Sequence, residues 1–241
     1  MQRYFAEIDK NDAVTLTKED EHHLLHVMRM KINDEIEVVF HNKVFLARIE
    51  KTNPLSINVV HEIANNVEIN EDVTLLFALT KGDKIDLVLQ KATELGVKKV
   101  ALIQSERTVV SYENKDLEKK TIRFQKIMKE AAEQCHRLIV PTFLGVYNLK
   151  NLPKELYSDL NYVAYEKDAD KVNDSFMGLK RNKSISILIG PEGGFSMQEI
   201  ERLENQGFIR TSLGKRILRA ETAAIYALSV IGYLLENEKA L

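Results

Sequence analysis

Residues 184–199 read SISILIGPEGGFSMQE, and this stretch decides the fold class that we predict for the chain. Its apolar first half is typical of a buried strand, and Ser196 and Glu199 have the spacing of a capping box at the start of a helix. Between them, Gly190, Gly193 and Gly194 expose the backbone and permit positive φ. Open α/β sheets bind ligands in such loops, at the carboxyl ends of parallel strands. The stretch therefore predicts a ligand-binding loop, and a tight turn that needs glycine for its geometry alone is the alternative.

The spacing of these glycines restricts the class of ligand. The loop lacks the Lys-Ser/Thr ending of a P-loop and the G-x-G-x-x-G spacing of a dinucleotide-binding turn. A nucleoside triphosphate and an ordinary dinucleotide are therefore disfavoured, and we expect a cofactor without phosphate groups.

A second loop is predicted in residues 211–225, which read TSLGKRILRAETAAI. A strand is expected to end at Leu213, and a helix is expected from residue 221 to residue 236. Between them, Lys215, Arg216 and Arg219 place three cations within five positions. Such a cluster suits an anionic partner such as RNA phosphate, whereas a solvated turn is the commoner role of three neighbouring cations.

Upstream of these loops, strands and helices alternate along the chain. Apolar periodicity predicts further strands at 73–79, 97–103 and 161–165, and helices at 83–95 and 116–135, with Gly96 as the C-terminal cap of the first helix. This alternation predicts an α/β domain with a mainly parallel sheet.

The first 70 residues follow a different pattern. A helix is expected from Thr17 to about Met30, and a polar stretch at 64–72 is typical of a linker. We therefore expect two domains, at 1–70 and 71–241. The β-like runs that predict a small barrel or sandwich in the first domain lie at 13–17, 35–40, 44–49 and 56–60.

Composition excludes several classes of protein. The chain is 44% hydrophobic and 29% charged and contains no long apolar run, so neither a disordered chain nor a membrane span fits. The first ten residues, MQRYFAEIDK, lack the features of a signal peptide, and the single cysteine, Cys135, cannot form a disulfide framework. We therefore expect a cytoplasmic protein. Its net charge of −2 exerts no global attraction on nucleic acid, so any RNA must bind to local patches.

The two loops together resemble a known family. GPEGGFS after an apolar strand and SLGKRILRAETAA before the last helix are similar to the paired cofactor loops of the SPOUT methyltransferases, and within them of the RsmE family. The resemblance covers nearly the whole chain, although Lys215 and Ala220 stand where many relatives have Pro and Thr. The other matching motifs, in order, are RYF near the N-terminus, H-x-x-x-V-M-R from His23, KGDKIDLVLQKATELGV from Lys81, SER from Ser105 and EAAEQCHRLIVP from Glu130.

This resemblance implies both fold and activity. It implies a PUA-like, β-rich RNA-binding domain followed by an α/β domain with a trefoil knot, in a homodimer that binds S-adenosylmethionine. It implies methylation of uracil N(3) at one uridine of 16S ribosomal RNA. We expect the substrate to be this RNA within the small ribosomal subunit, with free RNA as the alternative. The implied cofactor-binding residues are Tyr165, Glu166, Gly190, Pro191, Glu192, Gly193, Gly194, Leu213, Gly214, Leu218 and Ala220. The residues expected to bind RNA are Arg3, His23, Arg29, Lys81, Arg107, Arg137, Lys215 and Arg216.

The implied reaction needs a proton acceptor, because uracil N(3) carries a proton that must leave before methylation. Glu221 or Glu192 could accept it. Arg219, or else Arg3 or Arg29, could face the negative charge that develops on the base. For Glu221, a structural role as a carboxylate at a helix N-terminus is an equally good interpretation.

Other chemistry is less well supported by the sequence. His22 and His26 could share a helix face, but no third metal ligand is evident and we expect no metal. Cys135 and Tyr4 are interpreted as core residues. Two alternative functions remain open. One is a SPOUT ribose 2′-O-methyltransferase acting on ribosomal or transfer RNA, and the other is a non-catalytic RNA-binding factor in ribosome assembly.

Overall fold

The computed structural model describes residues 1–65, 67–110, 112, 114–166, 176, 179 and 183–237. The chain divides into two compact units, one of residues 1–68 with 132–139 and one of residues 69–131 with 140–241. Residues 132–139 therefore group with the N-terminal part of the chain. The domain boundary at residue 70 stays a prediction.

The first unit is built on a four-stranded sheet. Its strands are β1 (Arg3–Phe5), β4 (Glu35–Phe40), β5 (Lys43–Thr52) and β6 (Leu55–Ile63), in that order, with β1 parallel to β4 and the other pairs antiparallel. A short hairpin of β2 (Glu7–Ile8) and β3 (Val14–Thr15) accompanies it. Alternate residues of these strands face one core, as the period of two predicts. That core contains Tyr4, Leu16, Leu24, Ile36, Val38, Ala47, Ile49 and Ile57.

The predicted helix at 17–30 is shorter and less regular than expected. Thr17 caps α1 (Lys18–His22) by accepting a hydrogen bond from the Asp20 amide, and the chain continues as one π-helical segment, η1 (His23–Val27). The helix ends before Arg29, whose φ of 54° is left-handed. The sequence pattern did not reveal β1, because it is three residues long and pairs with a strand distant in sequence.

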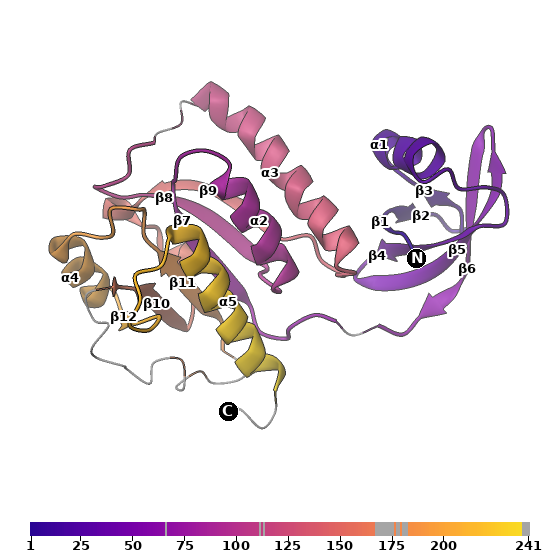
Figure 1. The fold of residues 1–241 in the computed structure, drawn as a ribbon. Helices are drawn as coiled ribbons and strands as arrows, with labels where there is room; N and C mark the ends of the chain where they lie inside the picture. The colour runs from indigo at the N-terminus through magenta and orange to yellow at the C-terminus, as the bar shows by residue number, and fades with distance from the viewer. Residues whose placement is uncertain are drawn as a thin grey trace. The chain divides into compact units, whose positions relative to one another are not determined.

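The second unit contains a six-stranded sheet in which every pair of neighbouring strands is parallel (Figure 1). This arrangement confirms the predicted α/β class with a mainly parallel sheet. The strand order is β12-β10-β11-β7-β8-β9. The strands are β7 (Val73–Ala78), β8 (Lys99–Gln104), β9 (Thr142–Asn148), β10 (Leu160–Ala164), β11 (Ile185–Ile189) and β12 (Phe208–Thr211).

Helices cover both faces of this sheet. Apolar residues of α2 (Lys84–Glu94), α3 (Asn114–Gln134) and α5 (Ala220–Glu236) share one buried cluster with Val73, Leu75 and Phe77 of β7. The intervening Leu76 belongs to the opposite cluster, with α4 (Met197–Asn205) and the 3₁₀ turns η2 (Leu149–Asn151) and η3 (Lys154–Leu156). Because β7 is covered on both faces, all six of its residues are buried, which explains its continuous apolar sequence.

Two sequence interpretations need correction, and one is confirmed. The stretch at 64–72 is not a simple polar linker, because Ile69 is buried and packs against Gly96. The strand β9 was missed, because it lies at an edge of the sheet and its residues are half-buried rather than continuously apolar. Gly96 ends α2 as predicted, with a φ of 87°. Among the described residues, no helix is both long enough and apolar enough to cross a membrane.

Candidate active site

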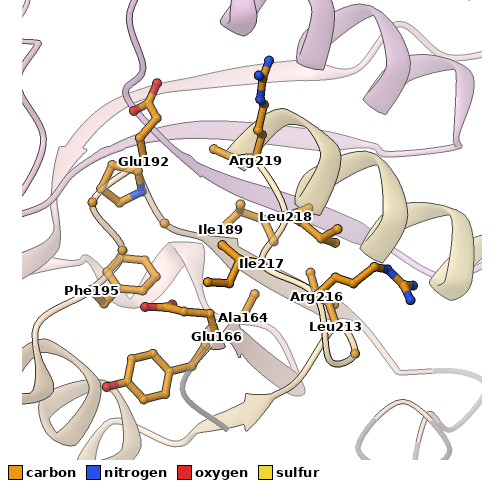
Figure 2. A pocket seen from close by; sticks show the side chains of 18 residues that line it. Ala164, Glu166, Ile189, Glu192, Phe195, Leu213, Arg216, Ile217, Leu218 and Arg219 are labelled. Carbon is orange, nitrogen blue, oxygen red and sulfur yellow. The ribbon is translucent and has the colours of Figure 1, made fainter. Parts of the chain in front are cut away.

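A cavity of about 440 Å³ lies at the carboxyl ends of β10, β11 and β12, three neighbouring strands of the parallel sheet (Figure 2). Its walls come from the residues that follow each strand: 164–166 after β10, 189–195 after β11, and 213–220 with Ala223 after β12. This is the edge at which open α/β sheets bind ligands. The volume falls within the roughly 300–1,000 Å³ of small-molecule sites.

The structure brings together the residues for which cofactor binding was predicted. Gly193 and Gly214 come from different loops and line the same cavity, as does Tyr165 at the end of β10. Their contacts with a cofactor remain predictions. The full set of predicted cofactor-binding residues that line the cavity is Tyr165, Glu166, Gly190, Pro191, Glu192, Gly193, Gly194, Leu213, Gly214, Leu218 and Ala220.

Glycine is favoured at two positions of the β11 loop, by packing at Gly190 and by backbone conformation at Gly194. A Cβ atom at Gly190 would lie 3.0 Å from the ring of Phe195, which is 1% exposed and has no room to move. A Cβ atom at Gly194 would lie 2.8 Å from Glu166 Oε1, and the φ of Gly194 is 64°. The β11 loop therefore folds back on Phe195 and packs closely against the residue that follows β10.

Hydrogen bonds brace this loop from outside the cavity. Ser196 and Glu199 form the predicted capping box of α4, with both of its hydrogen bonds present. The buried Glu199 carboxylate also accepts a hydrogen bond of 2.8 Å from the amide of Glu106. Arg107 donates from Nη1 to the Gly193 carbonyl at 2.8 Å. The side chain of Arg107, predicted to bind RNA, is thus placed against the β11 loop, although it remains exposed.

The two candidate proton acceptors occupy different positions. Glu192 lines the cavity, whereas Glu221, in the first turn of α5, does not. Lys84 lies between them, with its Nζ 2.8 Å from Glu192 Oε1 and 3.6 Å from Glu221 Oε2. Burial alone would raise the pKa of Glu192, but the hydrogen bond and charge of Lys84, together with the charge of Lys81, lower it. Glu192 is therefore a carboxylate held in its ionised form.

Two of the three cations of the β12 loop line the same cavity. Arg219 lines it and occupies the N-cap position of α5, and Figure 2 shows its side chain extending on the same side of the cavity as Glu192. Arg216, predicted to bind RNA, also lines the cavity. Lys215 is exposed and lies outside the lining. Ile217 lines the cavity although its side chain is 87% exposed.

In the first unit, the structure separates the predicted RNA contacts into two groups. Arg3 is 3% exposed, pairs with Glu37 at 2.7 Å and also donates to the His136 carbonyl. Arg137 is 4% exposed and pairs with Glu68 at 2.7 Å. Both guanidinium groups are therefore buried and neutralised within the unit, which leaves neither of them on its surface.

The remaining predicted RNA contacts are more accessible. Arg29 and Lys81 are exposed. His23 is half-buried, with its Nδ1 2.9 Å from the Tyr4 hydroxyl. Tyr4 itself belongs to the core, as predicted, whereas Cys135, also expected in the core, is half-buried directly after α3.

The structure also places the histidine pair considered as a metal site. The rings of His22 and His26 lie 4.8 Å apart. Within the described part of the chain, no group of three or more His, Cys, Asp or Glu side chains is arranged to hold a metal ion.

Sequence reasoning assigned no individual role to several residues at the site. Lys84 lies in a motif that matched the family, but its two carboxylate partners are about a hundred residues away, so the sequence could not reveal their contact. The others are apolar and could be assigned only to a core, namely Ala164, Ile189, Phe195, Ile217 and Ala223.

Comparisons with known families agree with this architecture. A model described as an RNA methyltransferase domain matches residues 67–232, and one described as an RNA methyltransferase PUA domain matches residues 16–60. The second match confirms the prediction of a PUA-like domain in the N-terminal part of the chain. The chain is 37% identical to ribosomal RNA small subunit methyltransferase E of Bacillus subtilis, over 98% of each chain.

Solved structures give the same result. A methyltransferase from Legionella pneumophila in complex with its cofactor SAM is 29% identical, with a TM-score of 0.86 over 97% of each chain. The ribosomal RNA small subunit methyltransferase E from Neisseria gonorrhoeae, bound to S-adenosyl methionine, is 29% identical, with a TM-score of 0.83 over 97% of this chain and 98% of that one. Both the motifs and the comparisons lead to one conclusion: the chain belongs to the ribosomal RNA small subunit methyltransferase E family.

Proposed function

We propose that the protein transfers a methyl group from S-adenosylmethionine to N(3) of one uracil in 16S ribosomal RNA. The observation that carries this proposal is the cavity in which all eleven predicted cofactor-binding residues meet. The relatives named for the small ribosomal subunit support the RNA class, and the resemblance to the RsmE family supports the target atom.

The chemistry of the cavity fits S-adenosylmethionine. At Gly190, Gly193 and Gly194, the absence of a side chain leaves the polar groups of the backbone open to a ligand. Apolar residues form much of the rest of the lining. The lining also carries charges of both signs, on Glu166 and Glu192 and on Arg216 and Arg219, which suits a ligand with both an ammonium and a carboxylate. When bound, the cofactor supplies an activated methyl group on a sulfonium, so we propose that no metal ion takes part.

The protein must then manage the charge on the acceptor base. Loss of the N(3) proton spreads negative charge over the uracil carbonyl oxygens, and a guanidinium nearby would stabilise it. Arg219 is well placed for this role, because it lines the cavity and its side chain is exposed. We propose Glu221 or Glu192 as the proton acceptor, and the lowered pKa of Glu192 weakens that carboxylate as a base.

We further propose that the protein acts as a cytoplasmic homodimer on RNA held by local cationic patches. Arg29 and Lys81 remain candidate RNA contacts because they are exposed, as are Arg107, Lys215 and Arg216 near the cavity. Because the net charge is −2, we expect binding to depend on such patches and on the structure of the assembled subunit.

The test is to incubate the protein with labelled S-adenosylmethionine and small ribosomal subunits from a strain that lacks the enzyme, and to analyse the digested RNA by mass spectrometry. We expect 3-methyluridine. A 2′-O-methylated nucleotide would instead establish the ribose methyltransferase alternative. RNA binding without cofactor binding in calorimetry would establish a non-catalytic assembly factor.

A further inference from the structure

Three charged side chains from distant parts of the sequence meet beside the cavity. Lys84 is the first residue of α2, Glu192 belongs to the β11 loop, and Glu221 belongs to the first turn of α5. The Lys84 ammonium lies 2.8 Å from one carboxylate and 3.6 Å from the other. One cation therefore links the β11 loop to the helix that directly follows the β12 loop, and these two loops form most of the cavity wall.

The position of Lys84 in its own helix gives no local reason for a lysine. A cation at the N-terminus of a helix faces the positive end of the helix dipole, where an acidic residue is favoured. The N-cap residue Asp83 makes no side-chain capping hydrogen bond that would offset this. The hydrogen bond to Glu192, followed by the charges of Glu192 and Glu221, raises the pKa of Lys84 and keeps it charged. The interactions that favour the ammonium therefore come from the two carboxylates.

Glu221 depends on this cation more than its distance suggests. Its side chain is 14% exposed, and its Oε2 is shielded from solvent and accepts no hydrogen bond from any described residue. A shielded carboxylate oxygen without a compensating charge is unfavourable. Without Lys84, Glu192 and Glu221 would also lose the cation that lies within 2.8 Å of one carboxylate and 3.6 Å of the other.

We propose that Lys84 is a positioning residue that clamps the β11 loop to the start of α5 and thereby holds the two walls of the cavity at their working separation. The clamp orders the two loops in the free protein. Its effect on the affinity for S-adenosylmethionine rests on the proposed function. An ordinary surface ion pair would leave loop order unchanged when removed.

The test is hydrogen–deuterium exchange on the full-length, cofactor-free protein, with Lys84→Met, which keeps an unbranched apolar stem and removes the ammonium group. We expect amides at 190–196 and 213–222 to exchange at least about threefold faster, because local opening becomes easier. Glu192→Gln alone weakens the link from the other side, because it removes the negative charge nearest to Lys84, so exchange should increase in the same two segments. Packing by the lysine stem would not predict this second effect.

A matched control is available on the same helix. Lys91 pairs with Glu94 at 2.8 Å and its side chain is 37% exposed, against 32% for Lys84, but its partner belongs to the same helix and not to a loop of the cavity. Lys91→Met should leave exchange at 190–196 and 213–222 unchanged. Wild-type exchange rates in these two segments, in Lys84→Met or in Glu192→Gln, would overturn the clamp.

Calorimetry with S-adenosylmethionine tests the functional consequence separately. We expect Lys84→Met to raise the Kd by roughly fivefold and Lys91→Met to leave it unchanged, since a partly exposed ion pair has a modest effect. A wild-type protein that binds no S-adenosylmethionine would refute the proposed function, while the exchange data would still decide whether the clamp exists. If Lys84→Met exchanges faster but binds S-adenosylmethionine with normal affinity, Lys84 orders the free loops only. Its proposed part in cofactor binding would then be overturned.

Discussion

The β11 loop of the second unit and the buried arginines of the first unit were both assigned functional roles from sequence motifs, and they differ in the structure. In the loop, glycines expose backbone to a cavity, and their role follows from local geometry at Gly190 and Gly194. In the first unit, Arg3 and Arg137 are buried against carboxylates. The burial of Arg3 and Arg137 was not predicted from the motifs, because the exposure of a side chain depends on partners far away in sequence.

The largest expected effect is on the stability of the first unit and not on the candidate active site. Arg137 pairs with Glu68, which also accepts hydrogen bonds from the amides of Leu138 and Ile139. Arg137→Met leaves that carboxylate without its counter-charge in a buried setting, so we expect a loss of about 3–5 kcal/mol in the free energy of unfolding of this unit. Urea unfolding followed by circular dichroism measures this loss.

The control for this prediction is Arg48→Met. Arg48 pairs with Glu35 on the surface, where both side chains are substantially exposed, so its loss should change stability by less than about 1 kcal/mol. If Arg137→Met has normal stability but binds RNA more weakly, Arg137 is an RNA contact and not a buried structural residue. The contrast between the two units would then be wrong.

The next effect tests the glycine loop. In Gly190→Ala, the new methyl group would meet the ring of Phe195 at 3.0 Å, and relief of that contact must move the loop. Overpacking of this kind costs about 1–3 kcal/mol, so we expect S-adenosylmethionine to bind roughly ten- to a hundredfold more weakly in calorimetry.

Gly232→Ala in α5 provides the matched variant. Its added methyl group would make ordinary contacts, the nearest at 3.8 Å, and alanine favours a helix. We expect unchanged cofactor affinity. Equal losses in the two variants would mean that the β11 loop has no special steric requirement.

The features of this molecule that could be predicted from the sequence are those with local signals, whereas features that depend on contacts between distant segments could not be predicted. The strand β11, the capping box and the class of the sheet were predictable, because apolar runs and Ser196 with Glu199 are local signals. The strand β9 was not, because an edge strand buries too little to show a continuous apolar run. The contact of Lys84 with Glu192 and Glu221 joins three distant segments, and only the folded sheet brings them together.

A smaller effect concerns an exposed cation of the first unit. Arg29 lies at a left-handed position after η1 and is exposed. If it contacts a phosphate, Arg29→Gln should weaken RNA binding and reduce the slope of log K against log salt concentration by about 1. Filter binding at several salt concentrations measures both quantities. Lys43→Gln is the control, because Lys43 already pairs with Glu62 on the surface. An unchanged slope for Arg29→Gln would remove Arg29 from the interface.

The smallest expected effect concerns the titration of Tyr4, a tyrosine buried in the core of the first unit. Burial, followed by the charges of Glu133 and Asp20, raises the pKa of Tyr4 from 10.0 to about 12. Because the folded state favours the protonated phenol, this contribution to stability is complete below pH 10.0 and is lost as the pH rises to about 12. The tyrosinate absorbance of wild type minus Tyr4→Phe should therefore titrate near 12. A midpoint near 10.0 would mean that Tyr4 is not held in the core.

The most direct test of the central claim is a crystal structure of the protein with S-adenosylmethionine. We predict that the cofactor lies between the β11 loop at 190–195 and the β12 loop at 213–220, in contact with the backbone of Gly193 and Gly214. Cofactor bound elsewhere, with this cavity empty or closed by side chains, would contradict the account.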